Sequence, residues 1–122
     1  MSKLNRHFKS YRYALMGIYL AFRYENNMIF HFLAAIVVIV LNFALKVDRS
    51  EWLITLMLIG LAWAAEIFNT AIETLADRIT TEQDPLIAKV KDLASGAVLT
   101  ICGFAVISAI IIYFPYIMKL LS

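Results

Sequence analysis

The sequence predicts an all-α integral membrane protein, with an N-terminal amphipathic helix at the membrane interface followed by three transmembrane helices. Of its 122 residues, 62% are hydrophobic and only 16% are charged, a balance well outside that of soluble globular domains. Three apolar stretches also approach or exceed the roughly 20 residues that cross a hydrocarbon core of about 30 Å. The chain length leaves room for a single domain, residues 1–122.

Residues 4–24 have the pattern of an interfacial helix. Apolar side chains recur at spacings of three and four and form one stripe, while basic side chains occupy the opposite side. Such a helix suits the boundary between acyl chains and anionic headgroups. A soluble amphipathic helix has a similar pattern, but the adjoining apolar stretch favours the interfacial interpretation. The apolar stripe consists of Leu4, Phe8, Tyr11, Leu15, Ile18 and Phe22.

The three spans are expected at residues 29–46, 52–76 and 93–118. The first two are separated by so few residues that they should form a tight antiparallel hairpin. The second connection is expected to be a longer loop, from Asp77 to Lys91, in which Pro85 would break a continuous helix. Pro115 is expected to mark the frayed outer end of the third span.

The basic residues predict the orientation of the spans. Eight of them precede the first span or lie between the second and third, and three fall on the other side. The eight are Lys3, Arg6, Lys9, Arg12, Arg23, Arg78, Lys89 and Lys91, and the three are Lys46, Arg49 and Lys119. By the positive-inside rule, the N-terminus and the second connection should face the cytoplasm, as in a multi-pass protein of the inner (cytoplasmic) membrane.

Charge and cysteine content narrow the class further. The net charge of +2, without a basic run, argues against nucleic-acid binding. Cys102 has no partner for an intrachain disulfide and is expected to be a small core residue. We expect no cleaved signal peptide, because the N-terminus is polar and amphipathic instead of carrying a short apolar region.

The second span carries an acidic stripe, formed by Glu66, Glu73 and Asp77, with Asn69 on its flank. The three carboxylates fall within about 40° on a helical wheel. A carboxylate within the hydrocarbon costs about 2.5 to 3.5 kcal/mol on insertion scales, so such residues are functional candidates. If Glu66 and Asn69 were the only polar residues of the stripe, a structural role in hydrogen bonds to neighbouring helices would explain them. Three acids on one face also need compensating charge, which a divalent cation such as Mg²⁺ would provide.

Other charged residues are expected at the depth of the lower part of this stripe. Glu25 ends the interfacial helix, and Lys91 and Asp92 open the third span. Each of them alone could be a solvated or snorkelling charge. Together they supply what phosphoryl transfer needs, namely carboxylates for a metal and a cation for the phosphates. Glu66, about 10 Å deeper than Glu73, would meet the hydroxyl of a lipid as general base.

The chain has no Walker-type loop, protein-kinase catalytic loop or nucleophile elbow. It resembles instead the bacterial diacylglycerol kinase and undecaprenol kinase family of small trimeric membrane enzymes, over nearly its whole length. The most specific part is Glu66-x-x-Asn69-Thr70-Ala71-Ile72-Glu73-x-x-x-Asp77, followed after thirteen residues by Lys91-Asp92. The combination is specific, whereas each element alone is weak.

The resemblance implies a role for each matching residue. Glu66 corresponds to the proton acceptor for the lipid hydroxyl, and Glu25 and Glu73 correspond to the pair that binds the divalent metal on the ATP phosphates. The resemblance implies nucleotide contacts from Tyr13, Gly17, Glu25, Asn69, Glu73, Asp77, Glu82, Gln83, Asp84, Lys91 and Asp92. It implies lipid-side contacts from Arg6, Glu66 and Ser95. It also implies a homotrimer.

Several details are similar to Gram-positive members of the family. The loop 81–86 contains the Pro-Leu pair of those members. His31 and Phe114-Pro115 are also similar to Gram-positive members. In place of the Glu-Arg-Asn-Phe run of many relatives, the chain has Glu25-Asn26-Asn27-Met28. On this resemblance undecaprenol, giving undecaprenyl phosphate, is the expected acceptor. Diacylglycerol, giving phosphatidic acid in phospholipid biosynthesis, is the alternative.

Two other functional classes compete with the kinase hypothesis. A small oligomeric proton-coupled transporter would use Glu66 as its coupling carboxylate, but it gives no reason for the charges gathered at one surface. A purely structural membrane subunit leaves the whole acidic stripe unexplained. The sequence therefore favours an ATP-dependent lipid kinase.

Overall fold

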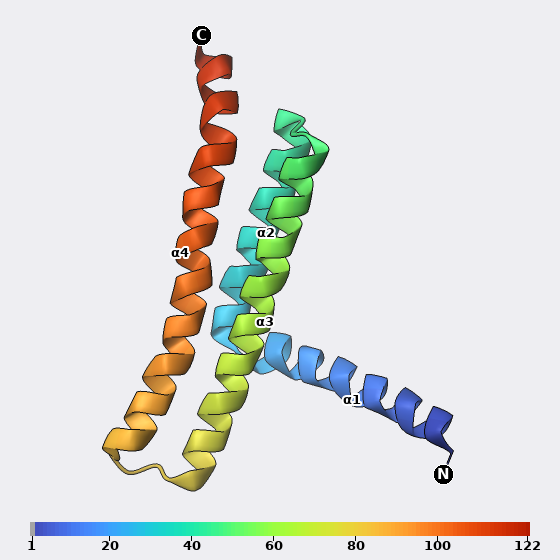
Figure 1. Cartoon of the computed structure of the whole chain (residues 1–122), viewed down its shortest axis with the longest axis vertical. Coiled ribbons are helices and arrows are strands. Elements are labelled where there is room, and N and C mark those ends of the chain that lie inside the picture. The colour runs from blue at the N-terminus through green and yellow to red at the C-terminus, as the bar shows by residue number, and fades with distance from the viewer. Residues whose placement is uncertain (1) are drawn as a thin grey trace.

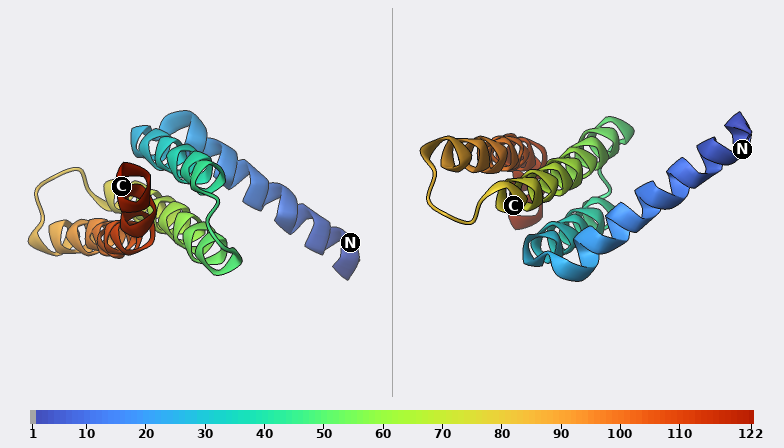
Figure 2. Two further views of the ribbon diagram at one scale, coloured as in Figure 1. Left: turned by 90° about the horizontal axis from the view of Figure 1, so that it is seen from above. Right: turned by 90° about the horizontal axis from the view of Figure 1, so that it is seen from below.

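The computed structural model describes residues 2–122 and folds them into four α-helices, so the all-α prediction is confirmed (Figure 1). The helices are α1 (Lys3–Tyr24), α2 (Asn26–Leu45), α3 (Arg49–Ile79) and α4 (Pro85–Leu121). The last three run side by side, and α3 packs against both α2 and α4. Each of these three is long and apolar enough to cross a membrane. Figure 2 shows α1 leaving this bundle on one side.

The α2–α3 hairpin has the short turn expected from the sequence. Lys46 adopts a left-handed backbone conformation (φ 53°), which turns the chain at the end of α2. The side chain of Asp48 accepts a 2.9 Å hydrogen bond from the Glu51 backbone N–H. The Asp48 backbone N–H donates in return to Glu51 Oε1, at 3.2 Å. This capping box satisfies N–H groups that the first turn of α3 would otherwise leave free.

The three bundle helices are joined at this hairpin end by buried polar side chains. Asn42 of α2 donates a 2.8 Å hydrogen bond to the hydroxyl of Thr55 on α3. The hydroxyl of Tyr113 on α4 donates to Asn42 Oδ1, at 2.6 Å. Tyr113 also packs in a small apolar cluster with Val47 and Ile112. One amide therefore fixes the register of three helices.

The expected long loop from Asp77 to Lys91 is wrong, because α3 continues to Ile79 and only residues 80–84 are non-helical. Pro85 starts α4 instead of breaking a helix, since the missing N–H of proline costs nothing in a first turn. The side chain of Asp84 caps this turn by accepting hydrogen bonds from the backbone N–H groups of Leu86 and Ile87.

Pro115 also differs from expectation, because it lies inside α4, which continues to Leu121. Proline is tolerated within membrane helices, since neighbouring helices and local adjustments satisfy the freed carbonyl. Pro115 therefore does not mark the end of the third span.

Helix lengths determine where the polar residues lie. The 31 residues of α3 rise about 46 Å, whereas the 20 residues of α2 rise about 30 Å. Both helices start from the same hairpin, so α3 extends about 16 Å beyond the point where α1 joins α2. The loop end of the bundle, where residues 80–84 connect α3 to α4, therefore projects past the junction of α1 and α2 (Figure 1).

Candidate active site

Glu66 is a buried carboxylate in the middle of α3, with 2% of its surface exposed. Its Oε2 lies 3.4 Å from Nε2 of His31 on α2. Its Oε1 is buried and has no hydrogen-bond partner among residues 2–122. The two oxygens of this carboxylate therefore have different surroundings, and one of them remains available to a ligand.

Two more buried acceptors follow Glu66 by one turn of α3. Asn69 is 6% exposed, and its Nδ2 lies 3.4 Å from Glu73 Oε1. Neither Asn69 Oδ1 nor the Thr70 hydroxyl oxygen has a partner among the described residues. Unpaired buried polar groups each cost about 1–3 kcal/mol, and native proteins contain few of them. Their gathering on one turn is what a site for polar ligand groups requires.

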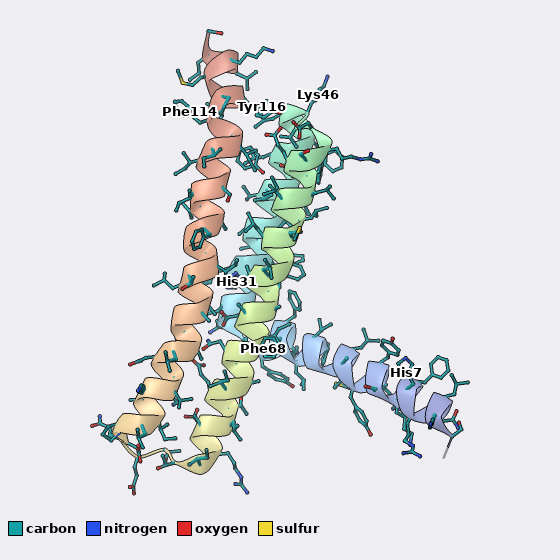
Figure 3. All side chains as sticks on the ribbon, viewed as in Figure 1. His7, His31, Lys46, Phe68, Phe114 and Tyr116 are labelled. Carbon is teal, nitrogen blue, oxygen red and sulfur yellow. The ribbon has the colours of Figure 1, made fainter. Side chains whose placement is uncertain are left out.

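A cavity of about 300 Å³ lies over this turn, and all three bundle helices contribute to it. Its polar lining consists of Asn27, His31, Glu66, Asn69, Glu73 and Ser95. Four of the residues expected in the site from the sequence are therefore brought together, including Ser95 from α4. His31 is an addition to them. Figure 3 shows His31 within the bundle, whereas His7 lies far out on α1.

Asp77 and Lys91 form an ion pair between α3 and α4 near the loop end. Both side chains are partly exposed, in contrast to Glu66. Lys91 also lines a polar cavity of about 530 Å³ together with loop residues. The loop residues expected in the site, Glu82, Gln83 and Asp84, all line this cavity. The structure thus places a cation and the expected nucleotide loop together, beyond the buried turn.

Glu25 lines a different cavity, of about 690 Å³ between α1 and α3, which it shares with Gly17 and Thr70. Glu25 and Glu73 therefore line different cavities, and Thr70, whose hydroxyl oxygen has no partner among the described residues, lines the cavity of Glu25. Among residues 2–122, no three His, Cys, Asp or Glu side chains are grouped so as to hold a metal ion.

Three of the expected site residues lie away from these cavities within the single chain. Asp92 is exposed on α4 and lines a separate cavity with Lys89. Arg6 and Tyr13 are exposed on α1, and the N-terminal part of this helix extends away from the bundle (Figure 1). The structure thus brings Glu66, Asn69, Glu73 and Ser95 to one cavity and Lys91 with the loop residues to a second, and these three residues line neither.

His31 is the site residue that the sequence analysis did not predict. There it served only as a feature similar to Gram-positive members of the family. A signal for it was nevertheless present. Asn42 lies eleven residues from His31 on α2, and Thr55 lies eleven residues from Glu66 on α3. In an antiparallel hairpin, pairing two polar residues at one position places the other two opposite each other.

Comparisons with known proteins show which family the chain is similar to. A family model described as prokaryotic diacylglycerol kinase matches residues 12–113. The undecaprenol kinase of Bacillus subtilis is 43% identical over 119 residues, covering 98% of this chain and 94% of that protein. The diacylglycerol kinase of Haemophilus influenzae is 31% identical over 106 residues, or 86% and 90% of the two chains. That of Pseudomonas aeruginosa is 36% identical over 85 residues, or 70% and 69%.

Proposed function

The chain belongs to the prokaryotic diacylglycerol kinase family and is a lipid kinase, and from this premise we propose that it transfers the γ-phosphoryl group of ATP to undecaprenol. Membership confirms the resemblance indicated by the acidic stripe, and it removes the transporter and structural-subunit alternatives. The 43% identity to an undecaprenol kinase over nearly the whole chain supports the choice of acceptor. Diacylglycerol remains the alternative acceptor, since the relatives from Haemophilus influenzae and Pseudomonas aeruginosa, which have lower identity, are named diacylglycerol kinases.

The observation that carries the proposal is that the cavity lined by Glu66 adjoins an apolar cavity, since His31 and Cys102 line both. An apolar cavity of about 200 Å³ begins beside His31 and Cys102 and extends toward the hairpin end as far as Tyr113. Small side chains of all three bundle helices leave this space open, among them Ala34, Ala62 and Ala105. The hydrocarbon chain of a lipid alcohol suits this space, and its hydroxyl would then lie at Glu66.

In the proposed reaction the acceptor oxygen attacks the γ-phosphorus. As this bond forms, the hydroxyl proton passes to Glu66 Oε1, and the bond from the γ-phosphorus to the bridging oxygen breaks to release ADP. Lys91 offsets negative charge on the phosphates from the loop end. Catalysis then consists mainly of positioning and charge stabilisation, as is usual for phosphoryl transfer.

The residues present suit a magnesium ion. Mg²⁺ prefers carboxylate oxygens together with phosphate oxygens and water, and Glu25 and Glu73 are the carboxylates proposed to hold it. The unpaired oxygens of Asn69, which lines the cavity of Glu73, and of Thr70, which lines that of Glu25, fit the same ligand preference. When bound, the ion would neutralise charge on the β- and γ-phosphates.

Three apolar helices and the family make the chain a multi-pass membrane protein, and we propose that its loop end faces the cytoplasm, where ATP is available. The excess of basic residues on that side supports this orientation. We also propose a homotrimer. Arg6, Tyr13 and Asp92 line neither the cavity of Glu66 nor that of Lys91 and the loop, so in an oligomer they could contact a neighbour's site.

A direct assay tests the proposed function. Purified protein in lipid nanodiscs would receive γ-labelled ATP and magnesium with undecaprenol, diacylglycerol or no added acceptor. We expect label to enter undecaprenyl phosphate at a kcat/KM well above that for phosphatidic acid. A preference for diacylglycerol would overturn the choice of acceptor, and transfer to neither lipid would overturn the kinase mechanism.

A further inference from the structure

We infer that His31 is a positioning residue for phosphoryl transfer, which holds Glu66 Oε2 so that Oε1 faces the acceptor hydroxyl. The inference rests on the proposed function, in which Glu66 accepts the proton of the lipid hydroxyl. It adds a residue of α2 to a site otherwise argued from α3, α4 and the loop.

The contact between His31 and Glu66 is the first observation. His31 Nε2 lies 3.4 Å from Glu66 Oε2, and the two side chains are only 15% and 3% exposed. Oε1 of the same carboxylate is buried without a hydrogen-bond partner among residues 2–122. A carboxylate held at one oxygen by a cation or an N–H donor presents the other oxygen in a defined direction.

The second observation is that the backbone of His31 on α2 is hydrogen-bonded to a side chain of α3. Its backbone carbonyl accepts a 3.2 Å hydrogen bond from the indole N–H of Trp63, which precedes Glu66 by one turn. The Trp63 ring packs edge-on against Phe22, with centroids 5.1 Å apart, and lies 6.2 Å from the ring of Phe32. These contacts hold α2 against α3 at the level of the carboxylate, so the imidazole cannot easily move away.

No other side chain among residues 2–122 is placed to hold Glu66 Oε2. The amide nitrogen of Asn69 lies toward Glu73, and Lys91 pairs with Asp77. Within residues 2–122, His31 is the one basic side chain within ion-pair distance of Glu66. Removal of the imidazole would therefore leave both carboxylate oxygens without a protein partner.

His31 acts through Glu66 and does not take the substrate proton. That proton moves from the acceptor hydroxyl to Oε1 while the new bond to phosphorus forms and the bridging bond breaks. His31 takes no part in this proton transfer. Loss of the imidazole should therefore lower kcat, by allowing Glu66 to adopt unproductive orientations, and should leave the KM for ATP unchanged.

Side-chain replacements of matched size test this inference. His31→Leu removes the donor and keeps the volume, His31→Gln places an amide nitrogen near the position of Nε2, and His31→Asn places it near Nδ1. His7→Leu is the control, because His7 lies on the exposed part of α1. The measurements are kcat and KM for ATP with undecaprenol, with gel-filtration profile and thermal transition as checks of folding.

We expect kcat of His31→Leu to fall by roughly 10- to 100-fold, the range for losing one interaction with a charged group, with KM for ATP unchanged. His31→Gln should recover most of the lost kcat. His31→Asn should have the same low kcat as His31→Leu. The control His7→Leu should have the kcat of the wild type. Wild-type kcat in His31→Leu would overturn the inference. If His31→Leu does not fold, equal kcat values for His31→Gln and His31→Asn would overturn it.

A double variant separates this inference from the proposed function. If His31 acts through Glu66, then His31→Leu/Glu66→Gln should be no slower than Glu66→Gln alone. A further loss comparable to that of His31→Leu alone would show an independent structural role and overturn the inference. Near-normal activity of Glu66→Gln would instead overturn the proposed role of Glu66 itself.

Discussion

Asn42 donates a buried hydrogen bond to the hydroxyl of Thr55, and this pair lies eleven residues along each helix from His31 and Glu66. A polar contact at the hairpin end thus sets the same register that brings an imidazole to a carboxylate about 16 Å away along the helices. The structural and catalytic polar residues of the bundle are linked through this register.

Asn42→Ala should destabilise the bundle. It removes the hydrogen bonds to Thr55 and Tyr113 and leaves both hydroxyls less satisfied in a buried site. We expect a loss of about 1–3 kcal/mol in the free energy of unfolding, measured by denaturant titration in mixed micelles. Thr100→Ala is the control, since its exposed hydroxyl bonds only a carbonyl of its own helix. Equal stabilities of the two variants would contradict this role of Asn42.

Lys91→Met should weaken nucleotide binding. Lys91 is paired with Asp77 and lines the loop cavity proposed for the phosphates, so its removal takes away positive charge there. We expect the KM for ATP to rise by roughly 10-fold or more. Lys89→Met removes the same charge from α4 outside that cavity. The prediction fails if both variants raise KM by the same factor.

Glu73→Gln should lose metal-dependent nucleotide binding while the fold remains. The new amide oxygen can still accept from Asn69, so the substitution removes charge and little else. We expect the magnesium concentration at half-maximal ATP binding to rise by at least roughly 10-fold, since even partners of metal ligands are worth this much. Glu51→Gln, on the same helix at the hairpin end, is the control. An unchanged magnesium requirement in Glu73→Gln would argue against a metal-binding role.

Ala105→Leu should obstruct the acceptor. It adds volume to the apolar cavity, so the KM for undecaprenol should rise by roughly 10-fold, consistent with the about 1–3 kcal/mol cost of overpacking. The KM for ATP should stay the same. Ala97→Leu, also on α4 but outside this cavity, gives the comparison. Unchanged lipid kinetics in Ala105→Leu would place the hydrocarbon chain elsewhere.

Much of the fold was predictable, because apolar periodicity and span length follow directly from the order of residues. The acidic stripe was predictable for the same reason, since helical spacing alone places Glu66 and Glu73 on one face. The helix ends near Pro85 were not, because proline breaks helices in most positions yet starts α4 here, with Asp84 as its cap. Proline as a helix breaker misled in the same way at Pro115.

The partner of Glu66 was not predicted, because the matching eleven-residue spacings on α2 and α3 become informative only once the packing of the two helices is known. A histidine in an apolar stretch is usually a satisfied core residue, and only the hairpin register reveals that His31 faces a carboxylate. The separation of Glu25 and Glu73 into two cavities likewise depends on how α1 leaves the bundle. Contacts between helices are set by three-dimensional packing, which spacing within one helix does not determine.

Single-turnover kinetics of Glu66→Gln test most directly whether Glu66 accepts the proton of the lipid hydroxyl. The amide keeps the size of the side chain but cannot accept the hydroxyl proton. With ATP, magnesium and undecaprenol preloaded, we expect nucleotide binding close to wild type and a phosphoryl-transfer rate lower by roughly 100- to 10,000-fold. A transfer rate near that of the wild type would contradict the assignment of Glu66 as the proton acceptor.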